Sequence, residues 1–426
     1  MTAETLWALG ERSIRELEVE TGIMASGRAE IYGCIFGRDS LITALKLLHV
    51  HQNSKDDYYP MLVRKVLLNL AKLQGTEHNI ESGEEPGKII HEYRTEKFEH
   101  LSSGERPWHI YPDNVMRNYD TVDATPLFLM AVHQYWRETK DEETLATLTP
   151  HVRAALEWLL EHADTNGDGL IDYWFHPERK GGGLVTQSWM DSHDSVFFEN
   201  SDDKPEYPIA PVEAQAYAFV ALRYWSEYFA EGEPEFSKKL LYRALHLKKV
   251  FNEKYVLRAG GSTSLAYAID GAGKPLSTPR SSMGHCLWAV YKDAEGVPES
   301  VLDLQYVSGV RRRLMGRDLF VRRAGVRTLS QRSRKFDPVS YHNGTIWPHD
   351  TAIIAEGFRN FGFVEDAKLL HGALLRAYEF FETPIELFAF TKRKYARYDG
   401  ACQVQAWSAA ALLVALSHKQ HSGTLQ

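Results

Sequence analysis

Two acidic residues of this sequence lie in surroundings that suit proton transfer. Asp191 follows Trp189 and Met190, and Glu386 is flanked by proline, isoleucine, leucine and phenylalanine. Apolar neighbours remove water from a carboxyl group and raise its pKa, which favours a proton donor near neutral pH. Glycosidic bond hydrolysis uses two carboxyl groups, one on the leaving oxygen and one on the opposite face of the sugar. An aspartate in a turn is the simpler account of Asp191 taken alone.

A second group of polar and aromatic residues marks the starts of predicted helices. These starts read GRDS at 37–40, TVDAT at 121–125, PIAPVE at 208–213, GHC at 284–286, WPHD at 347–350 and CQVQAW at 402–407. Acidic residues at helix starts commonly cap free N–H groups, and for Asp123 and Asp350 this role and a role in a pocket fit equally well. Carboxylates and amides mixed with Trp, His and Arg around one cavity are typical of a sugar site.

The elements that must position these residues are helices. Apolar periodicity predicts helices near 3–21, 39–51, 58–74, 123–138, 141–162, 208–230, 235–252, 283–292, 296–315, 347–361, 363–381 and 402–417. Strand signals are scarce, and stretches such as 88–93 and 320–326 are expected to form hairpins inside loops.

Long and short connections alternate along the chain. Connections after the even-numbered helices have one to six residues, whereas those after the odd-numbered helices are long, at 22–38, 75–122, 163–207, 253–282, 316–346 and 382–401. If successive helices are antiparallel, all long loops lie at one end of the molecule. Six helical hairpins can close into a ring, so we expect an all-α (α/α)6 barrel forming one catalytic domain over residues 1–426. An open array of hairpins is the alternative, but such repeats are usually uniform in length.

Composition disfavours several classes of protein. A formal net charge of −8 argues against nucleic-acid binding, and the basic run 311–313 is expected to be a solvated helix face. The three cysteines are far apart and include no CxxC pair, which argues against a disulfide framework or a thiolate zinc site. No apolar run reaches the roughly 18 residues of a membrane span, and residues 1–20 do not resemble a signal peptide. We therefore expect a cytoplasmic protein that binds neither nucleic acid nor membrane.

Nine short stretches resemble the amylo-α-1,6-glucosidase domain of glycogen debranching enzymes and its bacterial relatives. They are FGRDSL at 36–41, EPGKIIHE at 85–92, VDATPLF at 122–128, SWMDS at 188–192, PIA at 208–210, GHCLW at 284–288, YHNGTIWPHD at 341–350, ELF at 386–388 and QAWS at 405–408. Each stretch is weak alone, but the nine follow the family's order over nearly the whole chain.

The resemblance implies an (α/α)6 barrel that hydrolyses α-glucosidic bonds with inversion and without a cofactor. Asp191 matches the family's general acid and Glu386 its general base, and Asp194 is a reserve candidate for the acid. Arg38 and Asp39 resemble the pair that holds the non-reducing glucose in related helical-barrel glucosidases. Together with the helix starts, the motifs predict these substrate-binding residues: Phe36, Arg38, Asp39, Asp123, Trp189, Glu213, Gln215, His285, Asn343, Trp347, His349 and Trp407.

The expected activity is that of an exo-acting, inverting α-glucosidase on α-1,6-linked or other small α-glucosides and oligosaccharides. An inverting pair of carboxyl groups stands roughly 6.5–9.5 Å apart, and we predict that separation for Asp191 and Glu386. Many relatives carry further domains that this sequence lacks, so a small substrate is favoured. A phosphorylase on the same barrel is the alternative, although Glu386 argues against it. A non-catalytic sugar-binding protein is another, although it would not need both carboxylates.

A stretch with oxygen-bearing side chains at Asp164, Asn166, Asp168 and Asp172 resembles the start of a calcium loop. Its twelfth position is Phe175, where such loops need a bidentate carboxylate, so an Asx turn explains the stretch equally well. No HExxH pair is present, and a catalytic metal is not expected.

Overall fold

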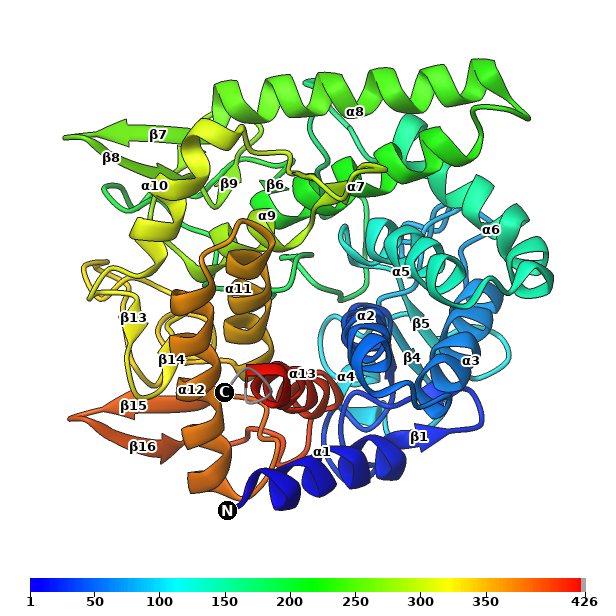
Figure 1. The fold of residues 1–426 in the computed structure, drawn as a ribbon. Helices are drawn as coiled ribbons and strands as arrows, with labels where there is room; N and C mark the ends of the chain where they lie inside the picture. Colours follow the sequence, from blue (N-terminus) through cyan, green and yellow to red (C-terminus); the bar gives the residue numbers. More distant parts are fainter. Residues whose placement is uncertain (423–426) are drawn as a thin grey trace.

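The computed structural model describes residues 1–422, and their main elements are two concentric sets of helices (Figure 1). The inner set comprises α2 (Gly37–Ser54), α5 (Ala124–Thr139), α7 (Val212–Tyr228), α9 (His285–Trp288), α11 (Pro348–Asn360) and α13 (Ala406–Ser422). The outer set comprises α1 (Ala3–Leu17), α3 (Tyr58–Lys72), α6 (Glu142–Glu161), α8 (Pro234–Lys254), α10 (Leu304–Leu314) and α12 (Val364–Phe381). One further turn of helix, α4 (Glu99–Ser102), lies in a loop, and a 3-10 turn at Ser281–Gly284 leads into α9.

The inner helices form a closed ring. Each contacts the next in chain order, and α13 packs back against α2. The outer helices cover this ring, with α1 on α13, α3 on α2, α6 on α5, α8 on α7 and α12 on α11. The predicted (α/α)6 barrel is therefore confirmed.

Burial explains which helices form the inner set. Residues Val212 to Leu222 of α7 are all buried, and many of them are alanines that let neighbouring helices approach closely. On α8, by contrast, only five residues are buried, on one stripe facing α7. A helix that is apolar on all sides belongs in the interior, and an amphipathic helix belongs outside.

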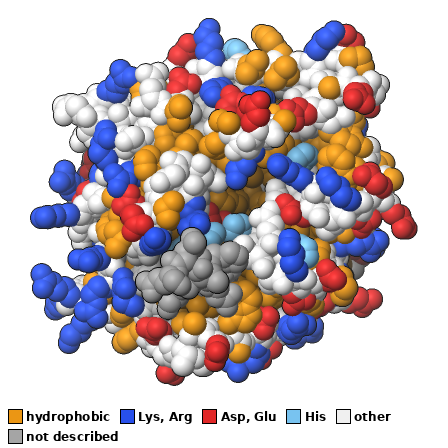
Figure 2. Space-filling model, in the orientation of Figure 1, with side chains coloured by type: hydrophobic (Ala, Val, Ile, Leu, Met, Phe, Trp, Pro, Cys, Tyr) orange, Lys and Arg blue, Asp and Glu red, His pale blue; other side chains and the backbone are white. Residues whose placement is uncertain are grey.

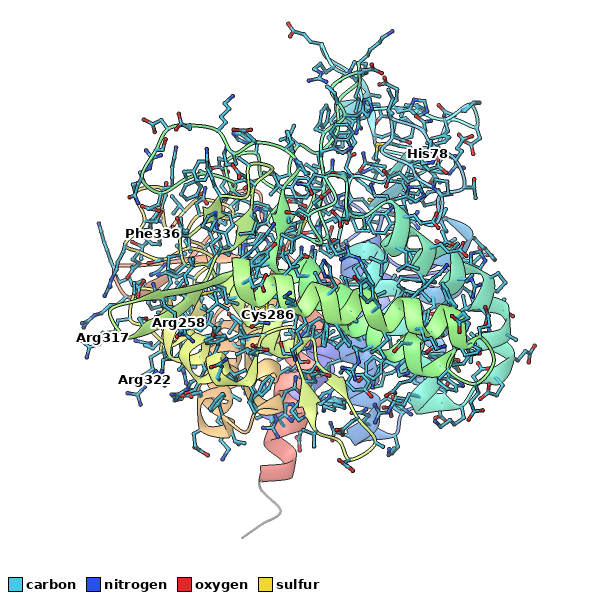
Figure 3. The ribbon with its side chains drawn as sticks, turned by 90° about the horizontal axis from the view of Figure 1, so that it is seen from above. His78, Arg258, Cys286, Arg317, Arg322 and Phe336 are labelled. Carbon is cyan, nitrogen blue, oxygen red and sulfur yellow. The ribbon has the colours of Figure 1, made fainter. Side chains whose placement is uncertain are left out.

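All long loops lie at one end of the barrel, as the alternation of connection lengths predicts. Figure 3 shows the loops on the upper side of the molecule, while α13 runs away from them and ends on the lower side. Each inner helix therefore begins at the loop-bearing end, which we call the rim.

The strands are short and lie in the loops. Hairpins are formed by β1 (Glu18–Val19) with β2 (Gly22–Ile23), β7 (Val256–Ala259) with β8 (Ser262–Leu265), β11 (Tyr291–Lys292) with β12 (Pro298–Glu299), β13 (Phe320–Val321) with β14 (Gly325–Val326), and β15 (Phe388–Thr391) with β16 (Lys394–Arg397). Two antiparallel three-stranded sheets have the orders β3 (Ile35–Phe36), β4 (Glu92–Arg94), β5 (Met116–Asn118) and β10 (Pro275–Leu276), β9 (Ala268–Ile269), β6 (Ala210–Pro211). The hairpin expected at 320–326 is confirmed.

Several expected boundaries are wrong. The stretch 88–93 does not form a hairpin, because β4 is the central strand of a sheet that joins two separate rim loops. The helix expected from 208 begins at Val212, after β6, and the one expected from 296 begins at Leu304, after β12. Both of these strands contain a proline, which cannot donate the N–H bond of a helix interior. The helix expected at 283–292 is a single turn, and the helix expected to reach residue 21 ends at Leu17, where β1 follows.

Candidate active site

A cavity of about 370 Å³, including its open mouth, lies at the rim where inner helices begin. Its walls come from five of the rim loops and from the first turns of α2 and α13, and they consist of Tyr32, Phe36, Arg38, Asp39, His91, Trp189, Asp191, Tyr341, His342, Trp347, Glu386, Gln405 and Trp407. The two carboxyl groups singled out in the sequence, Asp191 and Glu386, thus face the same space although they are far apart in the chain. Their exact separation stays a prediction.

Arg38 connects two carboxylates at the start of α2. Its Nε donates to Asp123 Oδ2 at 2.8 Å, and its Nη1 donates to Asp191 Oδ2 at 3.1 Å. Asp123 does not cap α5; its other oxygen accepts from the hydroxyl of Thr121. A buried guanidinium with carboxylates on two sides has a fixed orientation. Asp123 therefore positions Arg38, and Arg38 positions Asp191.

The backbone at Gly37 brings Arg38 to this place. A Cβ at position 37 would lie 2.0 Å from the carbonyl oxygen of Ile90, so only glycine allows this approach. The contact seats the 75–122 loop against the first turn of α2, and the Gly37 N–H donates to the carbonyl of His91 at 2.8 Å. His91 consequently lies in the cavity wall beside Phe36, with ring centroids 5.3 Å apart.

Asp191 has the proton affinity of a general acid. Burial raises its pKa to about 6, while the positive charge of Arg38 opposes the rise and Asp123 adds to it. Desolvation penalises the charged form of a carboxyl group, and an opposing cation limits the effect. Asp191 can therefore hold a proton at mildly acidic to neutral pH.

Glu386 is held by two hydrogen bonds on the other side of the cavity. The Tyr341 hydroxyl donates to Oε1 at 2.5 Å, and the Cys402 N–H donates to Oε2 at 2.8 Å. Burial raises the pKa of Glu386 to about 7, and both hydrogen bonds act against this rise. The Tyr32 hydroxyl lies 3.3 Å from that of Tyr341 and extends the polar group toward the mouth.

Asp39 lies beside these groups. Burial, together with the charges of Asp191, Glu386 and Asp123, raises its pKa to about 8, whereas Arg38 acts in the opposite direction. Its Oδ1 accepts from the amide of Gln405 at 3.2 Å.

Aromatic rings form a rigid floor. Trp407 stacks on His349 with centroids 3.7 Å apart, and Trp347 stacks on His342 at 5.1 Å. Trp189 meets Trp347 edge to face at 5.7 Å. Tightly packed aromatic rings cannot rotate freely, so this floor presents fixed apolar faces and fixed indole N–H groups.

Several polar atoms of the cavity wall are buried and have no hydrogen-bond partner. Among the described residues these include Arg38 Nη2, Trp189 Nε1, His342 Nε2, Gln405 Oε1 and Trp407 Nε1. Buried polar groups almost always find a partner in a folded protein. Five unsatisfied donors and acceptors around one small space therefore favour a ligand rich in hydroxyl groups.

The structure divides the predicted binding residues into two layers. Phe36, Arg38, Asp39, Trp189, Trp347 and Trp407 line the cavity. The other six, Asp123, Glu213, Gln215, His285, Asn343 and His349, are buried and do not line it. The six residues behind the wall could affect a bound substrate only through the residues that line the cavity. Substrate binding stays a prediction for all twelve residues.

Contacts of the second layer show what it supports. His285 lies between the Tyr217 hydroxyl at 2.5 Å and Asp350 Oδ1 at 2.8 Å, and its ring is parallel to that of Trp189. Asp350 therefore supports the floor through His285 and does not face the cavity.

Amides in this layer hold loop backbone. Gln215 binds the backbone of Ile171 and the carbonyl of Pro211. Asn343 donates to Asp194, the reserve acid, which is exposed and lies outside the cavity wall.

Five cavity residues escaped the sequence reasoning as binding residues: Tyr32, His91, Tyr341, His342 and Gln405. All but Tyr32 lie within stretches that resemble the family, and that resemblance was the available signal. Tyr32 lies in the 22–38 loop, where no pattern distinguishes it.

The possible calcium loop has other partners in this structure. Asp168 Oδ2 lies 2.7 Å from Lys254 Nζ, and Asp164 Oδ2 lies 3.5 Å from Arg243 Nη2. Within residues 1–422 no group of three His, Cys, Asp or Glu side chains is arranged to hold a metal ion. A calcium site stays a prediction that these ion pairs disfavour. No helix in the described part of the chain is long and apolar enough to cross a membrane.

A sequence model of the amylo-alpha-1,6-glucosidase family matches residues 88–305, slightly more than half of the chain. The chain belongs to this family. A model of the mannosylglycerate hydrolase MGH1-like glycoside hydrolase domain matches residues 301–383. Both matches are to glycoside hydrolases, and the chain is an enzyme of that class. No curated protein matches the chain.

Solved structures with a similar fold are also found. A GH63 mannosylglycerate hydrolase from Thermus thermophilus, in complex with glucose, is 17% identical with a TM-score of 0.66, over 96% of this chain and 99% of that chain. The same hydrolase in complex with Tris and D-glycerate gives a TM-score of 0.64 at 17% identity, with the same coverage. A wild-type glycosidase gives 0.61 at 14% identity, over 97% of this chain and 96% of that one. At these identities the similarity establishes the fold.

Proposed function

We propose that this enzyme is an exo-acting, inverting α-glucosidase that cleaves α-1,6-linked or other small α-glucosides. Asp191 is the general acid and Glu386 the general base. The observation that carries the proposal is a single cavity with two buried carboxyl groups, each with a raised pKa, among polar atoms that lack partners. Neither a metal nor a cofactor is needed for this reaction.

The proposed chemical step assigns one role to each of the two groups. Asp191 gives its proton to the glycosidic oxygen as the bond from that oxygen to the anomeric carbon breaks. Glu386 takes a proton from a water molecule, whose oxygen forms the new bond to the anomeric carbon on the opposite face. The α-linked glucose therefore leaves as β-glucose, and Asp191 and Glu386 then exchange protons with solvent to restore the starting state.

The shape of the cavity supports action on a terminal sugar. The buried rings of Trp347 and Trp407 line it, and its volume of about 370 Å³, mouth included, suits one terminal sugar. The unpartnered atoms Arg38 Nη2, Trp407 Nε1 and Gln405 Oε1 would bind hydroxyl groups of the bound sugar. A space of this size favours an enzyme that releases one sugar at a time.

A second candidate substrate is a mannoside of a small acid. It is supported by the match of residues 301–383 to the MGH1-like domain and by the fold shared with the mannosylglycerate hydrolase, one structure of which holds D-glycerate. The reaction and the roles of Asp191 and Glu386 would be the same, and only the sugar and the leaving group would differ.

A panel of glycosides tests both candidates. Isomaltose, panose, p-nitrophenyl α-glucoside and mannosylglycerate would be incubated with the enzyme, and the anomer released would be read by NMR before mutarotation. We expect β-glucose from the α-glucosides, at rates independent of phosphate. Release of the α-anomer would contradict inversion, and a sugar 1-phosphate formed only with phosphate would indicate a phosphorylase.

Two variants connect the activity to the cavity. Asp191→Asn should lower kcat by about 10³-fold on a substrate with a poor leaving group, whereas Asp194→Asn, which changes the nearby exposed acid, should leave turnover nearly unchanged. Equal activity of the folded Asp191→Asn variant and the native enzyme would refute the proposed mechanism.

A further inference from the structure

A second cavity, of about 1,040 Å³ including its open mouth, lies at the end of the barrel opposite the rim. It is lined by residues from α2, α5, α7, α11, α13 and the segment after α9, where the inner helices end. Figure 2 looks onto this end and shows a hollow near the middle of the face, with Lys and Arg side chains in blue and His side chains in pale blue around it.

Three basic residues line this cavity: Arg137 in the last turn of α5, Lys292 in β11 and Arg359 in the last turn of α11. None of the three forms an ion pair with a carboxylate of the described residues. The nearby carboxylates already have partners. Glu356 binds Lys46 Nζ at 2.5 Å and the indole N–H of Trp288 at 3.1 Å.

Glu138, the other carboxylate in the lining, accepts from two amides, Gln134 at 3.0 Å and Gln52 at 2.5 Å. Within the described residues, no carboxylate therefore pairs with the three cations of the cavity. Burial, and then the charge of Arg137, lower the pKa of Lys292, and burial lowers the pKa of Arg359. Both shifts have the sign expected for cations that lack an anion.

The helix dipole explains the positions of two of the three cations. A cation in the last turn of a helix interacts favourably with the partial negative charge there, and this accounts for Arg137 and Arg359 separately. It does not account for Lys292, which lies on a strand, nor for the convergence of all three on one polar hollow. Gln52, Gln134 and the Trp288 ring add hydrogen-bonding groups and an aromatic surface to the same wall.

We propose that this cavity binds the phosphoryl group of a small ligand, either inorganic phosphate or a phosphorylated sugar. A phosphoryl group carries up to two negative charges and three acceptor oxygens, which suits a cavity lined by three cations. In a phosphorylated sugar, the ring would lie toward Trp288, Gln52 and Gln134. The site lies at the far end of the barrel from Asp191 and Glu386, so it is separate from the catalytic cavity.

Isothermal titration calorimetry on the full chain tests the proposal with three probes: inorganic phosphate, glucose 6-phosphate and glucose. We expect one site for phosphate or glucose 6-phosphate and no binding of glucose at this site. Similar affinity for the first two identifies phosphate alone as sufficient, and a preference for glucose 6-phosphate identifies the phosphorylated sugar. Absence of binding by both up to about ten millimolar would overturn the proposal.

Variants locate the site. Arg359→Gln and Lys292→Gln should each raise the Kd by about tenfold, because each removes one charge-assisted hydrogen bond. Arg359→Lys, which keeps the charge, should retain most of the affinity and guards against a loss of binding through misfolding.

The matched control is Arg317→Gln, which removes one exposed positive charge at the outer margin of the molecule (Figure 3) and should leave the Kd unchanged. If the control weakens binding as much as the cavity variants do, the effect is one of net charge and the proposal fails. Hydrolysis of small glucosides should be the same in all four variants, since none of these residues lines the catalytic cavity.

Discussion

Two buried cations on the same helix, Arg38 at the rim and Lys46 further from it, differ in how completely the protein satisfies their partners. Arg38, at the rim end of α2, contacts Asp123 and also Asp191, whose carboxyl group faces the catalytic cavity. Lys46, further along α2, is fully buried and contacts Glu356, whose second oxygen is taken by Trp288. At the rim, the carboxyl group of Asp191 binds Arg38 and still faces the cavity, so a ligand can reach it. Beside Lys46, both carboxylate oxygens of Glu356 have hydrogen-bond partners within the protein. Changes at the rim should therefore affect activity, and changes at Lys46 should affect stability.

The largest expected effect is on catalysis at the rim. Asp191→Asn keeps the shape of the side chain but removes the proton donor, and general acid catalysis contributes about 10²–10⁴-fold. We expect kcat to fall by about 10³-fold on a substrate with a poor leaving group, measured by steady-state kinetics. On an activated aryl glucoside the loss should be smaller, since that leaving group needs less protonation. An equal loss on both substrates would show that Asp191 does not act as the acid.

The next effect is on stability. Lys46→Met leaves the carboxylate of Glu356 buried without its cation, and breaking a buried ion pair costs about 3–5 kcal/mol. We expect the free energy of unfolding, from urea denaturation, to decrease by about that amount, while kcat per folded molecule stays the same. Lys368→Met is the control, because its pair with Glu365 is exposed. If Lys46→Met changes kcat and not stability, the proposed contrast between Arg38 and Lys46 is wrong.

The pH dependence of kcat/KM should also reflect the two carboxyl groups at the rim. Asp191 must be protonated and Glu386 ionised for turnover. Because the pKa of the acid lies below that of the base, only a minor fraction of the enzyme carries this combination, and that fraction is largest between the two pKa values. Burial raises these pKa values to about 6 and about 7, which predicts a bell-shaped kcat/KM with its maximum near pH 6.5 and about tenfold loss per pH unit on each side. Because the two groups share one cavity and interact, the two pKa values read from the profile describe the pair and not either residue alone. A flat profile between pH 5 and 8 would contradict this assignment.

The smallest effect concerns the hydrogen bond to the base. Tyr341→Phe removes the hydroxyl that stabilises the ionised form of Glu386, so the pKa of Glu386 should rise. Because Glu386 has the higher pKa of the pair, the alkaline limb of kcat/KM should then move to higher pH by about one unit, and the maximum should fall by up to about tenfold. Tyr398→Phe is the matched control, because that ring packs on Tyr341 at 5.6 Å but forms no hydrogen bond to Glu386 within the described structure. An unchanged limb in Tyr341→Phe would show that Tyr341 does not tune the base.

Much of the fold is predictable because loop length is visible in the sequence. Alternating long and short connections leave few arrangements of antiparallel helices, and a closed ring places all long loops together. The hairpin of β13 and β14 was predictable, but the sheet of β3, β4 and β5 was not, since it joins two loops and its strands have only two or three residues each. Their pairing depends on contacts that exist only after the ring has formed.

The candidate site was predictable only in part. Asp191 and Glu386 stand out as acids among apolar neighbours, and both line the cavity. Successive residues of a helix rotate by about 100°, so only part of each helix start faces the axis. Glu213 and Gln215 therefore lie behind the cavity wall although they begin an inner helix. Tyr32 and Tyr341 lie in loops, where the position of a residue in the sequence does not determine which way its side chain points.

The gathering of all long loops at the rim has a consequence for how substrate preference can change. The closed ring of inner helices makes its contacts below the loops, so a longer or different loop alters the cavity mouth without altering the helix packing. The entropic cost of a longer loop grows only with the logarithm of its length, about 0.6 kcal/mol per doubling. New specificities can thus be sampled by insertion and recombination in the 75–122 and 163–207 loops, while the framework keeps enough stability to tolerate them.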